Sequence, residues 1–132
     1  MHVEVNDNTN IANRLLEIER ILLAVQRRIP EIEGLVLVTR DGLPIASLLH
    51  TGTDEDQISA MTAASLSLSE RVVIELKRGT MEQVIITGSD GLIIIRNAGE
   101  YAVLVAIVQI KAKLGLVLLD MKRSADKLSE LI

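Results

Sequence analysis

Hydrophobic positions recur every three or four residues near the start of the chain. The first nine residues form a polar, aperiodic segment in which only Met1, Val3 and Val5 are apolar. Asn10 is then a plausible N-cap before an apolar pattern that Pro30 ends. The apolar positions of this pattern are Ile11, Leu15, Ile18, Leu22, Val25 and Ile29. The pattern predicts a flexible tail over residues 1–9 and a long amphipathic helix after it.

Short apolar runs separated by turn residues follow this helix. Asp41-Gly42 lies between the runs 34–39 and 43–49, which is a strong hairpin signal. Three further runs, 81–87, 91–97 and 101–109, predict a three-stranded meander. Several of these strands are apolar on both faces, so the sheet must be covered on both sides.

Two more helices are predicted from capping and breaking residues. The first begins with a capping box from Thr53 to Asp56 and continues to about Lys77-Arg78, with Gly79 as its stop. The second covers residues 115–131 and turns four side chains inward, which are Leu118, Met121, Ala125 and Leu128. The predicted order is therefore helix, two strands, helix, three strands, helix, in a single domain over residues 10–132.

The middle helix has two different sides. An aliphatic stripe is expected to pack on the sheet and consists of Ile58, Met61, Leu68, Val72 and Leu76. The opposite side has no charge from Ile58 to Ser69 and carries small residues, namely Ala60, Ala63, Ala64 and Ser67. Small uncharged residues let another helix approach closely, although an Ala/Ser-rich surface chosen for helix propensity is the alternative.

The edges of the predicted sheet also indicate contact with a second copy of the chain. Pro44 cannot donate a ladder hydrogen bond, so its strand is expected at a guarded edge. The strand 83–87 has no such guard, and its candidate interface residues are Val84, Ile85, Ile86 and Thr87. Antiparallel pairing of this strand with its own copy would set the two middle helices side by side, which predicts a twofold-symmetric homodimer.

Composition excludes several classes of function. The chain has no cysteine, which removes disulfides, thiolate metal sites and cysteine nucleophiles. A net charge of -4 argues against non-specific nucleic-acid binding. Apolar runs fall short of the roughly 20 residues needed to cross a bilayer, and the start of the chain lacks a secretory signal pattern. We therefore expect a cytoplasmic protein without direct membrane insertion.

Catalytic chemistry finds little support in the residues. His2 and His50 are too sparse for a metal cluster or a catalytic triad. Asp41 and Asp90 each precede a turn glycine, where aspartate serves the backbone. The segment 88–91 joins two strands and lacks the residues of a phosphate-binding loop. We expect neither an enzyme nor a cofactor site.

The run from Gly34 to Ala46 resembles the first hairpin of the Roadblock/dynein light chain family. The resemblance continues through the Ala/Ser-rich middle helix, residues 101–105 and Leu114-Gly115-Leu116-Val117. It implies a Roadblock/profilin-like α+β sandwich of order α-β-β-α-β-β-β-α. Its five-stranded antiparallel sheet would carry the middle helix on one face and the outer two helices on the other.

The resemblance also implies a function. Prokaryotic MglB-like members of the family bind a small Ras-like GTPase and modulate its GTP hydrolysis or its location, and others act as scaffolds. Candidate partner-binding residues are Arg71, Glu75 and Arg78, while an arginine finger could come from Arg40, Arg71, Arg78 or Arg96. Alternatives are a passive dimeric assembly module that recruits a non-GTPase partner, a heterodimer with a paralogue, and a small-molecule sensor.

Overall fold

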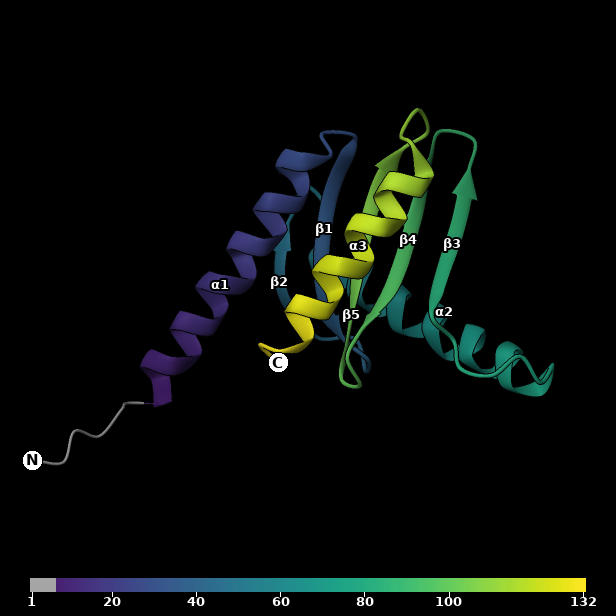
Figure 1. Cartoon of the computed structure of the whole chain (residues 1–132), viewed down its shortest axis with the longest axis horizontal. Helices are drawn as coiled ribbons and strands as arrows, with labels where there is room; N and C mark the ends of the chain where they lie inside the picture. The colour runs from purple at the N-terminus through teal and green to yellow at the C-terminus, as the bar shows by residue number, and fades with distance from the viewer. Residues whose placement is uncertain (1–6) are drawn as a thin grey trace, which may run out of the picture.

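The computed structural model describes residues 7–132, with side chains from residue 10 onward. Three helices and five strands follow one another in the predicted order (Figure 1). Their bounds are α1 Asp7–Arg28, β1 Ile32–Thr39, β2 Pro44–Leu48, α2 Glu55–Glu75, β3 Gln83–Gly88, β4 Gly91–Ala98, β5 Ala102–Gln109 and α3 Leu114–Ser129. The strands form one antiparallel sheet in the order β2-β1-β5-β4-β3.

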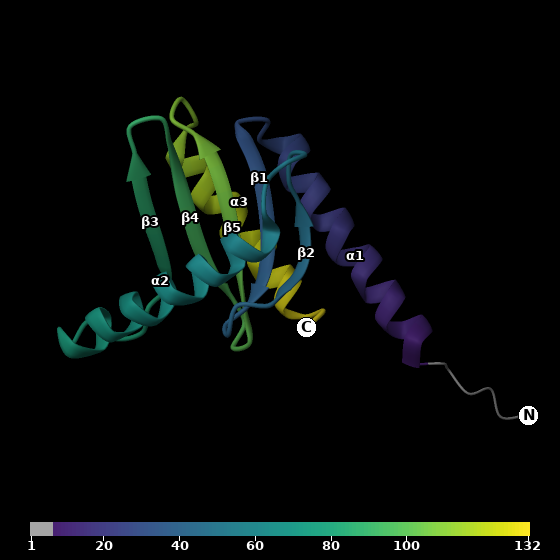
Figure 2. The same ribbon diagram turned by 180° about the vertical axis from the view of Figure 1, so that it is seen from behind.

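The sheet separates two helical layers, as predicted. α1 and α3 cover the face seen in Figure 1, and α2 crosses the opposite face seen in Figure 2. Alternate residues of each central strand serve the two layers, because successive side chains of a strand point to opposite faces. On β1, Leu35 and Leu37 join the core beneath α1 and α3, whereas Val36 and Val38 join the core beneath α2.

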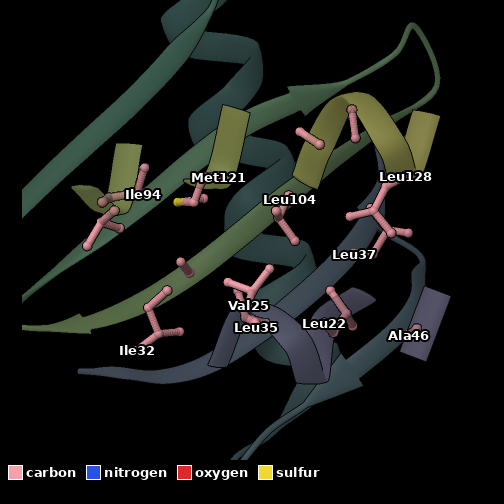
Figure 3. Packing of buried hydrophobic residues seen from close by; sticks show 14 of the residues in the cluster. Leu22, Val25, Ile32, Leu35, Leu37, Ala46, Ile94, Leu104, Met121 and Leu128 are labelled. Atoms are coloured by element: carbon pink, nitrogen blue, oxygen red, sulfur yellow. The ribbon is translucent and has the colours of Figure 1, made fainter. Parts of the chain in front are cut away.

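The larger core lies between the sheet and the two outer helices. Leu22 and Val25 of α1 and Met121 and Leu128 of α3 converge on Leu104 and its neighbours in the sheet (Figure 3). All of them are essentially inaccessible to water. Because aliphatic side chains fill this core without aromatic rings, its stability depends on the close packing of many small groups.

Helix ends differ from the prediction by a few residues. α1 begins at Asp7, three residues before Asn10, because its first turn precedes the apolar pattern that signalled the helix. The remainder of the predicted tail, residues 1–6, lies outside the described residues. α2 is capped by Asp54, whose carboxylate accepts hydrogen bonds from the amides of Asp56 and Gln57, so the capping box at Thr53 was wrong.

The end of α2 also differs from the prediction. Lys77 adopts a left-handed backbone conformation with φ 58°, and the Arg78 amide donates to the Val73 carbonyl at 2.8 Å. This bond pattern closes a helix in the same way as a C-terminal glycine. The helix therefore ends at Glu75, four residues before Gly79.

The predicted packing stripe of α2 was wrong. Ser59, Thr62 and Leu66 are the buried residues of this helix. Only Ile58 of the predicted stripe is part of the core, and the other four positions are exposed, which are Met61, Leu68, Val72 and Leu76. The helix uses its small polar residues to lie close to the sheet and turns much of its aliphatic surface away from this protomer.

Candidate protein interface

The two sheet edges have different chemistry. At β2, Pro44 pairs with Val38 beside an irregularity in the register, so the expected guarded edge is confirmed. Within residues 7–132, β3 pairs with β4 and leaves its other side open. Ile85 and Ile86 on this open edge are 39% and 44% exposed. An exposed aliphatic strand without proline or charge is a ready template for pairing with another strand.

The predicted small-residue side of α2 is only partly exposed. Ala60, Ala64 and Ser67 face solvent in this protomer, but Ala63 is half-buried. A methyl group added at Gly42 would lie 3.3 Å from the Cβ atom of Ala63, which shows that Ala63 faces the β1–β2 turn. Ala63 is therefore already in contact with its own domain.

A different side of α2 forms an exposed aliphatic stripe. We define the α2 stripe as Met61, Leu68 and Val72, whose side chains are 56%, 63% and 48% exposed. Spacings of seven and four residues place them on one side of a helix. Sequence periodicity identified these positions but assigned them to the sheet, because periodicity alone does not show which partner covers an apolar side.

An apolar pocket connects the α2 stripe with the open strand edge. It has a volume of about 200 Å³ and lies between α2 and the sheet. Its lining comes from α2, β3, β4 and β5 and comprises Ile58, Met61, Thr62, Ser65, Ile86, Ile93, Ile95, Val105 and Ile107. Exposed aliphatic groups around a concave surface are typical of a place where another protein segment packs.

A polar network holds α2 in position beside this surface. The guanidinium of Arg40, at the end of β1, is paired with the carboxylate of Glu70 on α2. It also donates to the side-chain oxygen of Asn97 at 3.1 Å. Asn97 in turn donates to the Met81 carbonyl at 2.6 Å. The network therefore links α2, two strand ends and the segment that leads into β3.

The predicted partner-binding residues lie at the exposed end of α2. Arg71 and Glu75 form an ion pair of 3.4 Å one helical turn apart, and both side chains are exposed. Arg78 is exposed in the turn that follows the helix. Arg40 is held in the network described above, and Arg96 donates to Gln83 at 3.0 Å. Of the four arginines considered for an arginine finger, Arg71 and Arg78 are therefore the most exposed to a partner.

The histidines and aspartates considered as catalytic groups do not form a cluster in the described part of the chain. His50 is exposed in the loop before α2, and His2 lies outside the described residues. The Thr39 hydroxyl donates to the Asp41 carboxylate at 2.6 Å and, together with the Asp41 amide, lowers the pKa of that carboxyl group. Among residues 7–132 no three His, Asp or Glu side chains are placed to hold a metal ion, and no helix is long and apolar enough to span a bilayer.

These features describe an α+β sandwich with an open aliphatic edge and a partly exposed helix on one face. The chain belongs to the Roadblock/LC7 domain family, whose model matches residues 18–108. Two Methanocaldococcus jannaschii proteins, MJ0310 and MJ1340, are 39% and 38% identical to it over 111 residues, which is 84% of this chain and 96% of each relative.

Solved structures support the same fold at lower identity. A structure of MglB in a tetrameric arrangement superimposes with a TM-score of 0.81 at 20% identity and covers 89% of both chains. Myxococcus xanthus MglB gives a TM-score of 0.81 at 20% identity over 87% of this chain and 94% of its own. A Roadblock/LC7 domain from Streptomyces avermitilis gives 0.79 at 19% identity over 84% of this chain and 93% of its own. The predicted family and fold are confirmed.

Proposed function

We propose that this protein is a homodimeric, non-catalytic regulator or scaffold that binds a small Ras-like GTPase and modulates its GTP hydrolysis or its location. The dimer is supported mainly by one observation: the unpaired aliphatic edge of β3, the exposed α2 stripe and the apolar pocket between them are adjacent. Family membership and the likeness to MglB support the GTPase as the partner.

The direction of α2 gives the dimer a specific geometry. Figure 2 shows α2 crossing the sheet obliquely and running past β3 at its C-terminal end. Val72, Ile74 and Leu76 at this end are between 48% and 66% exposed. If β3 pairs antiparallel with its copy, the twofold axis carries the end of each α2 over the partner's sheet. The overhanging aliphatic side chains of one protomer would then fill the apolar pocket of the other.

The proposed dimer leaves a composite outer surface for the GTPase. Ala60, Ala64 and Arg71 lie on the side of α2 that points away from the sheet, and Glu75 follows one turn later. Exposed charges at the rim of an interface govern orientation and association rate more than affinity. We assign the contacts with the GTPase to Arg71, Glu75 and Arg78 from both protomers, and the groups that hydrolyse GTP to the GTPase itself.

A binding experiment tests this assignment. A small Ras-like GTPase from the same cell, loaded with GDP or with a non-hydrolysable GTP analogue, is titrated with the full chain by calorimetry. We expect binding that differs between the two nucleotide states and is weakened by Arg71→Glu. Arg123→Glu, an exposed arginine on α3, is the matched control and should bind as the wild type does.

Three outcomes separate the proposal from its alternative. Nucleotide-dependent binding that Arg71→Glu weakens supports regulation of the GTPase. Equal binding in both nucleotide states favours the passive assembly module, in which the same dimer only recruits a partner. If the protein binds the GTPase in neither nucleotide state, the GTPase is not its partner. The dimer is then tested separately by the mass of the protein in solution.

A further inference from the structure

The charges of the molecule are divided unevenly between α1 and α3 and the rest of the chain. Residues 7–28 and 110–132, which form α1, α3 and the short segments on either side of α3, contain nine of the 14 Lys and Arg but only six of the 18 Asp and Glu. Their net charge is therefore +3, whereas the rest of the chain carries -7, which together give the -4 of the whole chain. A face whose sign opposes that of the whole protein orients it toward an anionic partner.

The outward side of α1 alternates aliphatic and basic residues. Leu16, Arg20, Leu23 and Arg27 follow one another at spacings of four, three and four residues, which keeps them on one side of the helix. All four are exposed, and the two leucines are 50% and 37% accessible. The opposite side of α1 supplies the core, so this row is turned away from the sheet.

The neighbouring helix repeats this combination. On α3, Leu116 and Leu119 are 58% and 44% exposed, and Arg123 follows one turn later and is also exposed. α1 and α3 lie side by side on one face of the sheet (Figure 1). Their outward sides therefore form one surface, which we call the basic-aliphatic face.

The same chemistry continues where α1 ends and α3 begins. Arg28, Lys111, Lys113 and Leu116 line one hollow of about 290 Å³ together with Glu31. Arg28 is paired with Asp120 at 2.9 Å, so the two lysines, against the single carboxylate of Glu31, leave a net positive charge in the hollow. Ile110 beside them is 53% exposed.

We infer that the basic-aliphatic face adsorbs to the surface of an anionic phospholipid membrane. Cations of a helix surface attract anionic headgroups, while aliphatic side chains between them enter the boundary with the acyl chains. An acidic protein would also match the positive charge, but it would not explain exposed leucines interleaved with arginines on both helices. The adsorption is peripheral and reversible, in keeping with helices that do not span a bilayer.

Because α2 lies on the other face of the sheet, adsorption through the basic-aliphatic face would keep α2 accessible to a partner. A membrane on the basic-aliphatic face leaves α2 and the edge of β3 on the far side of the sheet and at its margin. In the proposed dimer, the basic-aliphatic faces of both protomers lie on the same side of the joined sheet. The two faces would then bind the membrane together, and the α2 surface would point away from it.

Vesicle co-sedimentation of the full chain tests this inference. We expect binding to vesicles that contain phosphatidylglycerol, little binding to vesicles of phosphatidylcholine alone, and loss of binding at high salt. Each of the substitutions Arg20→Gln and Arg27→Gln should lower the partition coefficient roughly fivefold, the factor expected for one basic residue near an anionic surface. Arg71→Gln and Arg78→Gln on the α2 side are the matched controls and should bind as the wild type does.

Leucine substitutions separate adsorption from charge attraction alone. Leu16→Ser and Leu23→Ser should weaken vesicle binding while leaving the charge unchanged. The inference is overturned if anionic vesicles do not bind the protein, if lipid charge makes no difference, or if the α2 controls lose as much binding as the α1 variants. Because the dimer contacts lie on other elements, failure here with an intact dimer leaves the proposed function standing.

Discussion

Replacing Leu68 by alanine should weaken the dimer without weakening the fold. Leu68 is 63% exposed in the protomer and lies in the middle of the α2 stripe. Complete burial of a leucine side chain contributes about 1.5–3 kcal/mol. Only the exposed part of Leu68 is buried on dimerisation, and the alanine methyl group retains some of that contribution. Each substitution should therefore remove about 1 kcal/mol of dimerisation free energy per copy. Twofold symmetry counts this loss twice, so the dimer should lose about 2 kcal/mol, or roughly 30-fold in its dissociation constant.

The dissociation constant is measured by sedimentation equilibrium over a dilution series, and the free energy of unfolding by urea denaturation of the monomer. Leu116→Ala is the matched control, because Leu116 is similarly exposed, at 58%, but lies on α3. We expect Leu68→Ala to shift the dissociation constant and Leu116→Ala to leave it unchanged. An unchanged constant for Leu68→Ala, or an equal shift for the control, would refute the role of the α2 stripe.

Three other predictions concern the fold. Removing Arg40 and Glu70 singly and together should give a coupling energy of about 1 kcal/mol in urea melts, because the paired side chains are only about one-third exposed; additive losses would show that the pair does not hold α2. Gly91→Ala should cost about 1–3 kcal/mol, because its Cβ would lie 2.8 Å from the Val108 carbonyl oxygen, whereas Gly115→Ala meets no atom within 4 Å and should not destabilise; equal effects would contradict this packing. The hydrogen bond from Thr39 lowers the folded-state pKa of Asp41 below its ordinary value of 3.8. This hydrogen bond therefore stabilises the fold above pH 3.8, and its contribution disappears as the pH falls through the lowered folded-state pKa. Thr39→Val should raise this pKa in an NMR titration, and an unchanged pKa would assign the shift to the backbone.

Most of the architecture could be predicted from short sequence patterns, because turns, strands and helices are determined largely by interactions between residues that are near one another in the chain. The Asp41-Gly42 turn, the apolar strand runs between turn residues and the spacing of Leu22 and Val25 each reflect one preference of the backbone or one buried side. The buried side of α3 was therefore correctly identified, and so was that of α1 from Ile18 onward, whereas Ile11 and Leu15 of the predicted pattern are 60% and 37% exposed. The error at the start of α2 arose because two possible capping residues, Thr53 and Asp54, are adjacent.

The surface of α2 could not be predicted in the same way. Its aliphatic positions have helical spacing, and so do its small residues, but spacing does not reveal which of the two sides meets the sheet. The domain buries Ser59 and Thr62 because small side chains bring the helix close to the strands. The interface residues of α2 and β3 remain predictions. The structure adds the α2 stripe as the stronger candidate, because its side chains have more aliphatic surface to bury than Ala60 or Ala64.

The mass of the protein in solution tests the central claim most directly. Light scattering of the full chain should give twice the 14.4 kDa of one chain at micromolar concentration. The mass should fall toward that of one chain for Leu68→Ala on dilution. A mass of 14.4 kDa for the wild type at every concentration would contradict the account, because β3 and the α2 stripe would then remain exposed to water.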